Sequence, residues 1–277
     1  MSMPVRFSAA RWERAYRGVV AAAFRRVPFY RDQWVAAGRA LAEPEPTPSA
    51  ALSGQLHRLC PFARPFDPSR EPSLWIGDGR DLRDALALAG APRRTPVAEV
   101  RAAVLDRRAL GPRGPRYGAL LAPGADVVDE DRRRALNAAA LGTLGAPAQA
   151  GQVIVVGERA TLEALGPDLD GVRVHAIERM TAASAVQDPR PGVLYDPHLG
   201  YFAATHPACG RAHLLWRRFH ARPAGRAWAV TALRRRRPVL LDVLPDGSGT
   251  PGATTLTTGT PATAVCADHG TPVLTTH

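Results

Sequence analysis

The sequence contains no lysine: its 36 basic residues other than histidine are all arginine. Without a lysine amine, the chain can form no Schiff base with a carbonyl substrate. It also lacks the flexible, compact ammonium group with which many enzymes hold a phosphate. Acidic residues number only 25, so the formal net charge is still +11. The chain is therefore strongly basic, and any reaction that needs a lysine of its own is excluded.

Cysteines and long apolar runs are also scarce. Three cysteines are too few for a disulfide framework, which favours a reducing compartment. No apolar stretch is long enough to cross a bilayer, and residues 1–20 lack the apolar core of a signal peptide. We therefore expect a cytoplasmic protein with no membrane partner.

The arginines cluster at residues 132–134 and 234–237. A basic surface of this kind suits a nucleic acid, an acidic acyl carrier protein or a phosphorylated metabolite. Aromatic residues make up only 6% of the chain and do not alternate with the arginines, as a stacking platform for bases requires. Nucleic acid is therefore not the expected partner. A merely solvated face remains the alternative to a docking surface.

Hydrophobic periodicity predicts an α/β fold, with parallel or mixed sheets flanked by helices. Residues 7–38 carry apolar side chains at three- and four-residue spacing, and Pro28 should break this helical stretch. Residues 152–156 and 172–177 are typical of strands, and the helical segment between them implies a right-handed parallel crossover. Further predicted elements are a strand at 117–123, a helix at 129–144 and a helix beginning in 161–165.

Composition divides the chain into three parts. Residues 1–50 form a helical segment followed by a proline-rich linker, and residues 51–246 form the α/β core. Residues 247–277 form a short, β-rich, threonine-rich tail, in which two strands should flank a turn at 268–270. The tail could cap the core of its own chain or pair with another subunit.

Five segments occur in an order that matches one known superfamily. The first is RRVPFYRDQWVAAG at residues 25–38, and the other four lie between residues 153 and 246: VIVVGERATLEAL, VRVHAIERMTAAS, YDPHLGYFAATHPACGRAHLLWRRFHARP and GRAWAVTALRRRRPVLLDVLPDG. Together these segments resemble the adenylate-forming (AMP-binding) superfamily, of the phenylacetate–CoA ligase type. The resemblance implies the large domain of a ligase that activates a carboxylic acid with ATP.

The resemblance also assigns a vestigial AMP or ATP site and shows where it is damaged. Glu178 stands where the family has the tyrosine that stacks on adenine, Ala182 replaces the glutamate that helps to hold magnesium, and Leu241 replaces an arginine. On this resemblance, we expect the Ser/Thr/Gly-rich phosphate loop and the C-terminal domain with its catalytic lysine to be missing. The residues that still stand at nucleotide-contacting positions are Gly157, Glu158, Thr181 and Asp246.

These departures suggest a degenerate homologue, a pseudoenzyme of secondary metabolism such as antibiotic biosynthesis. The favoured hypothesis is a protein that binds a carboxylic acid or an acyl or aryl thioester, and acts as a repurposed enzyme or auxiliary subunit without ATP-dependent ligation. One alternative is a minimal ligase, acting on an acyl or aryl acid, that still uses ATP. The other is a purely structural subunit of a biosynthetic complex.

One group of residues has metal-like spacing. His206, Cys209 and His213 would place three ligands on a tight turn followed by a strand or helix, compatible with tetrahedral zinc. The resemblance also favours a metal here, because some relatives in the family carry a structural metal in the same region. The alternative is a polar loop in which Cys209 packs inside. Cys266 and His269 also lie close in sequence, but proximity alone does not make a catalytic dyad.

A second group, Asp196, His198 and Tyr201, offers candidate catalytic residues. A carboxylate, an imidazole and a phenol could serve as an acid–base set if all three side chains lined the pocket for the acid. That arrangement depends on tertiary geometry.

Overall fold

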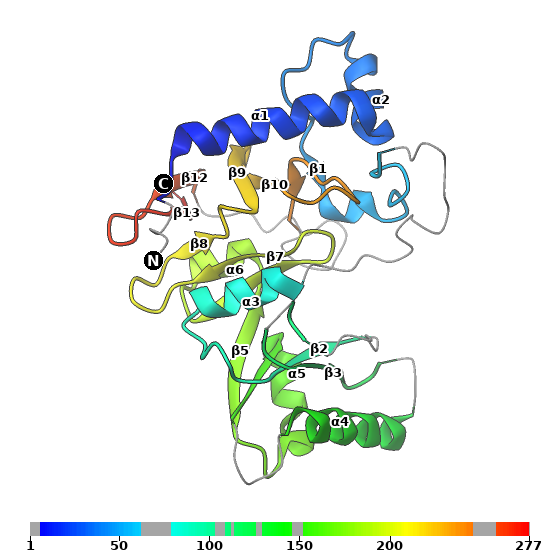
Figure 1. Ribbon diagram of the computed structural model, residues 1–277, viewed down its shortest axis with the longest axis vertical. Helices are drawn as coiled ribbons and strands as arrows, with labels where there is room; N and C mark the ends of the chain where they lie inside the picture. The colour runs from blue at the N-terminus through cyan, green and yellow to red at the C-terminus, as the bar shows by residue number, and fades with distance from the viewer. Residues whose placement is uncertain are drawn as a thin grey trace.

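The computed structural model describes residues 6–61, 79–102, 109–111, 114–125, 129–145, 152–245 and 259–276. The described residues form an α/β fold with one nine-stranded mixed sheet and one four-stranded sheet (Figure 1). Helices flank both sheets and the C-terminal region is rich in strands, so the predicted fold class is confirmed. None of the described helices is long and apolar enough to cross a membrane.

The N-terminal segment is a pair of helices, α1 (Ala9–Arg26) and α2 (Pro28–Ala36). The predicted break at Pro28 is confirmed: the proline occupies the first turn of α2, where its missing amide hydrogen needs no partner. Tyr16, Val20 and Phe24 are buried on one face of α1, as the periodicity predicts. Figure 1 shows this helix lying across the smaller sheet.

The smaller sheet has the strand order β1-β11-β10-β9. Its buried carboxylate, Asp242, accepts hydrogen bonds from Tyr16 of α1 (2.8 Å) and Thr231 (3.0 Å) and pairs with Arg222 (2.7 Å). This network fastens α1 to the sheet. The strands are β1 (Thr47–Pro48), β9 (Phe219–Ala224), β10 (Ala227–Ala232) and β11 (Val243–Leu244), and the 3₁₀ turn η1 (Ser49–Leu52) follows β1.

The parallel half of the larger sheet contains five strands in the order β6-β5-β4-β2-β3. Between β4 and β5 lies α5, so the predicted parallel crossover is confirmed. The strands are β2 (Val97–Arg101), β3 (Tyr117–Leu121), β4 (Val153–Gly157), β5 (Val174–Met180) and β6 (Gly192–Asp196). The helices are α3 (Gly79–Leu88), α4 (Glu130–Leu144), α5 (Arg159–Ala164) and α6 (Ala182–Gln187), with a 3₁₀ turn, η3 (Gly166–Leu169).

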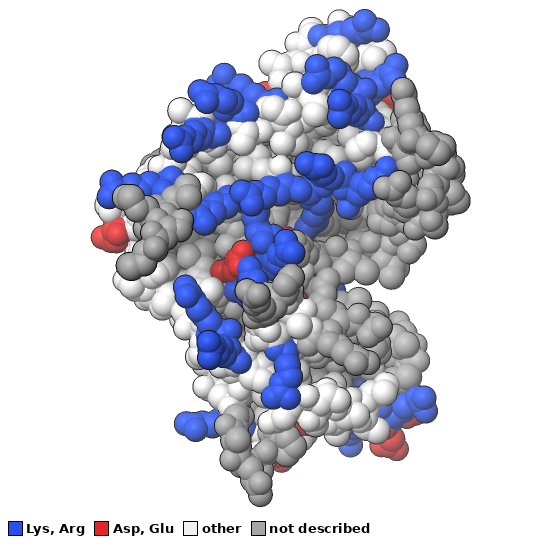
Figure 2. All heavy atoms as spheres, in the orientation of Figure 1, with Lys and Arg blue, Asp and Glu red and all other residues white. Residues whose placement is uncertain are grey.

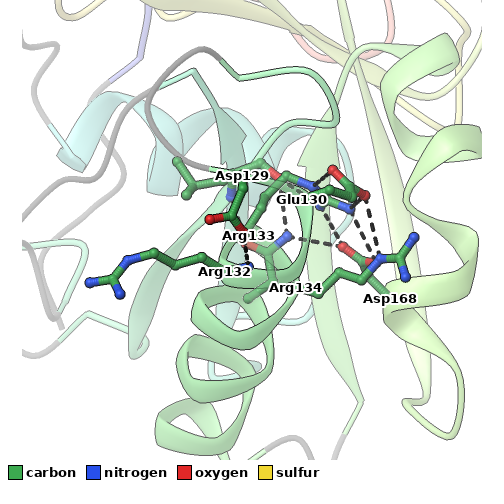
Figure 3. A network of polar contacts seen from close by, with 8 residues as sticks. Asp129, Glu130, Arg132, Arg133, Arg134 and Asp168 are labelled. Carbon is green, nitrogen blue, oxygen red and sulfur yellow. Dashed lines mark hydrogen bonds and ion pairs between the residues drawn. The ribbon is translucent and has the colours of Figure 1, made fainter.

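Separate hydrophobic cores fill the two faces of this half. One core packs α3 against the sheet, and the other packs α4 against the opposite side. An ion-pair network closes the second core: Arg133 of α4 binds Glu130 and reaches Asp168 of η3 at 2.6 Å (Figure 3). Asn137 adds hydrogen bonds to both backbone groups of Leu121, the last residue of β3. These polar contacts fix the register of α4 on the sheet.

The antiparallel half of the larger sheet consists of two hairpins placed side by side. Strands β7 (Gly200–Thr205) and β8 (Ala212–Leu214) form one hairpin, and β12 (Pro261–Val265) and β13 (Pro272–Thr276) form the other. The threonine-rich tail therefore pairs within its own chain, through β13 and β8. Figure 2 shows arginine side chains gathered on one face, in a band over the upper part of the molecule.

Candidate metal centre

The turn between β7 and β8 begins at His206 and ends in a glycine. The His206 carbonyl accepts a hydrogen bond from the Gly210 amide at 2.8 Å, and the His206 amide donates to the Arg211 carbonyl at 3.0 Å. Gly210 has a φ of +66°, a conformation that glycine adopts without steric penalty. This tight turn carries Cys209 directly before the glycine.

The turn between β12 and β13 repeats this geometry. The Cys266 carbonyl accepts from the Gly270 amide at 2.8 Å, and the Cys266 amide donates to the Thr271 carbonyl at 2.9 Å. Gly270 has a φ of +61°, nearly that of the first turn. Here His269 stands directly before the glycine. The two turns are thus equivalent in backbone structure, each with a histidine and a cysteine at its first and fourth positions.

Pairing of β8 with β13 brings the two turns together. Val273 lies opposite His213 in the sheet, and the His213 ring, from the middle of β8, reaches Thr271 of the second turn. The ligand atoms of Cys209, His213, Cys266 and His269 all lie within 4.8 Å of one another. The Cys209 sulfur is 3.1 Å from Nε2 of His213, and the Cys266 sulfur is 3.5 Å from Nδ1 of His269. Four side chains that can each offer one ligand atom therefore converge on one point.

His213 of β8 has the orientation and the protonation state of a metal ligand. Its Nδ1 lies 2.8 Å from the Thr271 hydroxyl, which leaves Nε2 facing the cluster. Burial, followed by the neighbouring histidines His269 and His206, lowers the pKa of His213 to about 4. The imidazole is therefore neutral at pH 7, the form that a metal requires.

The two thiols differ in their electrostatic environment. Burial raises the pKa of Cys209. Burial also opposes ionisation of Cys266, but hydrogen bonds from His269 and the Asp268 backbone outweigh it, and the pKa of Cys266 is lowered. Two sulfur and two imidazole donors at this separation fit a tetrahedral zinc ion, which prefers such mixed sets. The four residues can thus hold a metal ion.

His206, which the sequence predicted as a ligand, lies beside this set. Its ring centroid is 4.0 Å from that of His269 and 5.3 Å from that of His213, and its Nδ1 accepts a weak hydrogen bond from the Ala208 amide. Cys209 and His213 belong to the converging set, but Cys266 and His269 were not expected there. The signal was present: His-x-x-Cys-Gly at 206–210 and Cys-x-x-His-Gly at 266–270 are the same five-residue turn with its ligands exchanged.

Two of the four positions assigned to the nucleotide, Gly157 and Thr181, have structural roles in the fold. A Cβ on Gly157 would lie 3.0 Å from a methyl group of Val100, so close packing against β2 requires the glycine. Glu158 is exposed at the start of α5, and Thr181 accepts a hydrogen bond from the Ser184 amide as the N-cap of α6. Asp246 lies outside the described residues.

Glu178, at the position of the adenine-stacking tyrosine, is held by two arginines. Its carboxylate pairs with Arg190 at 2.8 Å and with Arg159 at 3.2 Å. In the sheet it lies opposite Gly157, so these ion pairs cover the end of β4. This arrangement holds a carboxylate where the resemblance places an aromatic ring.

The three candidate acid–base residues have separate partners. Asp196 is fully buried and accepts hydrogen bonds from the backbone amides of His198 and Leu199. The His198 ring lies 2.7 Å from the Ser49 hydroxyl, and the Tyr201 hydroxyl donates to Glu99 at 2.6 Å. Each of the three side chains thus has a hydrogen-bond partner other than the remaining two side chains.

Glu99, in the middle of β2, is the centre of a buried polar cluster. It is only 1% exposed, accepts hydrogen bonds from Tyr117 and Tyr201 at 2.6 Å each, and pairs with Arg101 at 3.0 Å. Burial, followed by the charge of Glu99, raises the pKa of Tyr201 well above its usual value. Tyr201 therefore remains a neutral hydrogen-bond donor. The sequence did not point to Glu99 because its partners Tyr117 and Tyr201 come from other strands, distant in the chain.

Comparison with models of known protein families gives no match, and no curated protein matches the chain. The site is therefore interpreted from its own geometry.

Proposed function

We propose that this chain is a zinc-stabilised relative of the adenylate-forming enzymes that binds a carboxylic acid or acyl thioester and performs no ATP-dependent ligation. It acts as an auxiliary or repurposed member of a biosynthetic system. The proposed loss of ligation is supported above all by one observation: the Glu178 carboxylate is paired with Arg159 and Arg190.

An adenine ring needs an apolar or aromatic face on which to stack. At Glu178 it would meet a carboxylate whose two ion pairs, with Arg159 and Arg190, it would have to displace. Gly157 lies opposite Glu178 in the sheet. The side chains of Val100 and Leu162 occupy the space beside it, so the glycine is needed for packing. ATP binding therefore has no support from the described residues at these positions.

Zinc would be held by Cys209, His213, Cys266 and His269. Four protein ligands occupy all positions of a tetrahedral ion, which is typical of a structural and not a catalytic site. Bound zinc supplies a cross-link between the two turns. The residues themselves tie the C-terminal hairpin to β8 and so close the antiparallel half of the sheet.

The test is calorimetric titration of the zinc-loaded protein with ATP and magnesium, together with a pyrophosphate-release assay in the presence of aryl and short aliphatic acids. We expect no saturable ATP binding and no pyrophosphate. Saturable binding with pyrophosphate release would instead support the minimal ligase. Absence of binding when the same acids are titrated without ATP would support a purely structural subunit.

A further inference from the structure

A cavity of about 360 Å³ lies between α3 and the amino ends of β2 and β4. Its floor is formed by buried apolar side chains, among them Leu86, Val97 and Ile154. The volume is at the lower end of the roughly 300–1,000 Å³ typical of small-molecule sites. The cavity therefore suits a small ligand with one apolar end.

Three arginines, Arg83, Arg93 and Arg94, line the same cavity. Arg83 binds Asp84 through two hydrogen bonds of 3.0 and 2.8 Å, and Asp84 is also reached by Arg218 at 3.3 Å. Asp84 is thus already neutralised. Arg93 and Arg94 are exposed and have no acidic partner among the residues that the structure describes.

An ion pair anchors α3, the helix that forms one wall of this cavity. Arg218 binds Asp81 at 2.6 Å, and Asp81 lies in the first turn of α3. This contact joins the helix to the segment before β9, so the wall that carries Arg83 is anchored from a distant part of the chain. An anchored wall and an adjacent apolar floor reduce the ordering that a ligand would have to impose.

We propose that this cavity binds a carboxylic acid with a single-ring or short aliphatic tail. The tail lies on Leu86, Val97 and Ile154, and the carboxylate pairs with Arg93 and Arg94 at the rim. Guanidinium groups bind carboxylates through paired, charge-assisted hydrogen bonds. The class of ligand rests on the proposed function. The new element is the location of the binding site, at the amino ends of β2 and β4.

This place is opposite to the carboxyl-end edge at which open α/β sheets usually bind their ligands. In the same core layer, further along β2, Glu99, Tyr117 and Tyr201 bond to one another and form a buried polar cluster. The cavity at the amino ends instead combines an apolar floor with positive charge.

The experiment is calorimetric titration of the zinc-loaded full chain with benzoate and hexanoate. Benzamide, hexanamide and inorganic phosphate serve as ligand controls, since each lacks either the charge or the tail. The test variants are R93A/R94A and Ala87→Phe, the latter because Ala87 is an exposed cavity-lining residue of α3, where a ring obstructs entry. The matched control is R25A/R26A, which removes two adjacent exposed arginines from the last turn of α1.

We expect the acids to bind wild type and R25A/R26A equally, and R93A/R94A and Ala87→Phe about tenfold or more weakly. The amides and phosphate should bind at least as weakly as the acids bind R93A/R94A. If the acids bind wild type but neither test variant differs from it, the cavity is not the site and the proposed function stands. If phosphate binds as well as the acids, the inference is overturned in favour of a general anion site. If no acid binds wild type, both the inference and the proposed ligand are overturned.

Discussion

The parallel and antiparallel halves of the larger sheet are held together in different ways. In the parallel half, apolar cores cover both faces, and the Arg133 network adds buried ion pairs between α4 and η3. In the antiparallel half, β8 is only three residues long and meets the C-terminal hairpin through two residue pairs. Short edge hairpins are weak by themselves. The Cys/His set thus lies beside the shortest strand pairing of the larger sheet among the described residues.

The largest effect should follow removal of the metal. If zinc is present at about a thousand times its dissociation constant, its loss costs about 4 kcal/mol, which corresponds to a decrease of roughly 10 °C in Tm. Differential scanning calorimetry with and without a chelator measures this. Cys209→Ser and Cys266→Ser should each abolish the chelator response, because each removes a ligand.

Cys60→Ala is the matched control, since this buried cysteine lies outside the cluster. Its own stability will fall, but its chelator response should persist. The hypothesis that zinc stabilises the antiparallel half would be contradicted if the wild-type protein contained no zinc by elemental analysis and gained no stability from added zinc.

The next largest effect concerns the parallel half. Arg133→Ala leaves Asp168, whose side chain is 6% exposed, without its closest cation, and should lower the free energy of unfolding by about 3 kcal/mol. Urea denaturation measures the change. Arg132→Ala removes the neighbouring exposed arginine and should be nearly neutral. Equal effects of the two substitutions would show that the buried network does not stabilise this half.

The smallest effect is a pH dependence of the metal-free antiparallel half. The folded pKa of His213 is lowered to about 4 from its usual 6.5, so the unfolded chain binds the proton more tightly. The free energy of unfolding is therefore highest above pH 6.5 and decreases as the pH falls towards 4. Between pH 7 and pH 5 the decrease is about 2 kcal/mol. Urea denaturation in chelator at both pH values tests this. His213→Asn should reduce the dependence by that amount, whereas an unchanged dependence would assign it to other groups.

Much of the local structure could be predicted because its signals are short-range. Pro28 divides the N-terminal helices, and Asp129 caps α4 by accepting a hydrogen bond from the Arg132 amide. The apolar run at 153–157 forms the central strand β4. Each signal acts through a preference of the backbone within a few residues. The assignment to an adenylate-forming family remains a prediction.

The sequence by itself determined several of the helices and strands, the α/β class and two of the four residues of the Cys/His set. Only the tertiary structure decided that β13 pairs with β8, because alternating apolar residues mark a strand but do not name its partner. That pairing adds Cys266 and His269 to Cys209 and His213. The tertiary structure also decided which groups the side chains of Asp196, His198 and Tyr201 bond to, since the direction of each side chain depends on what packs against its strand.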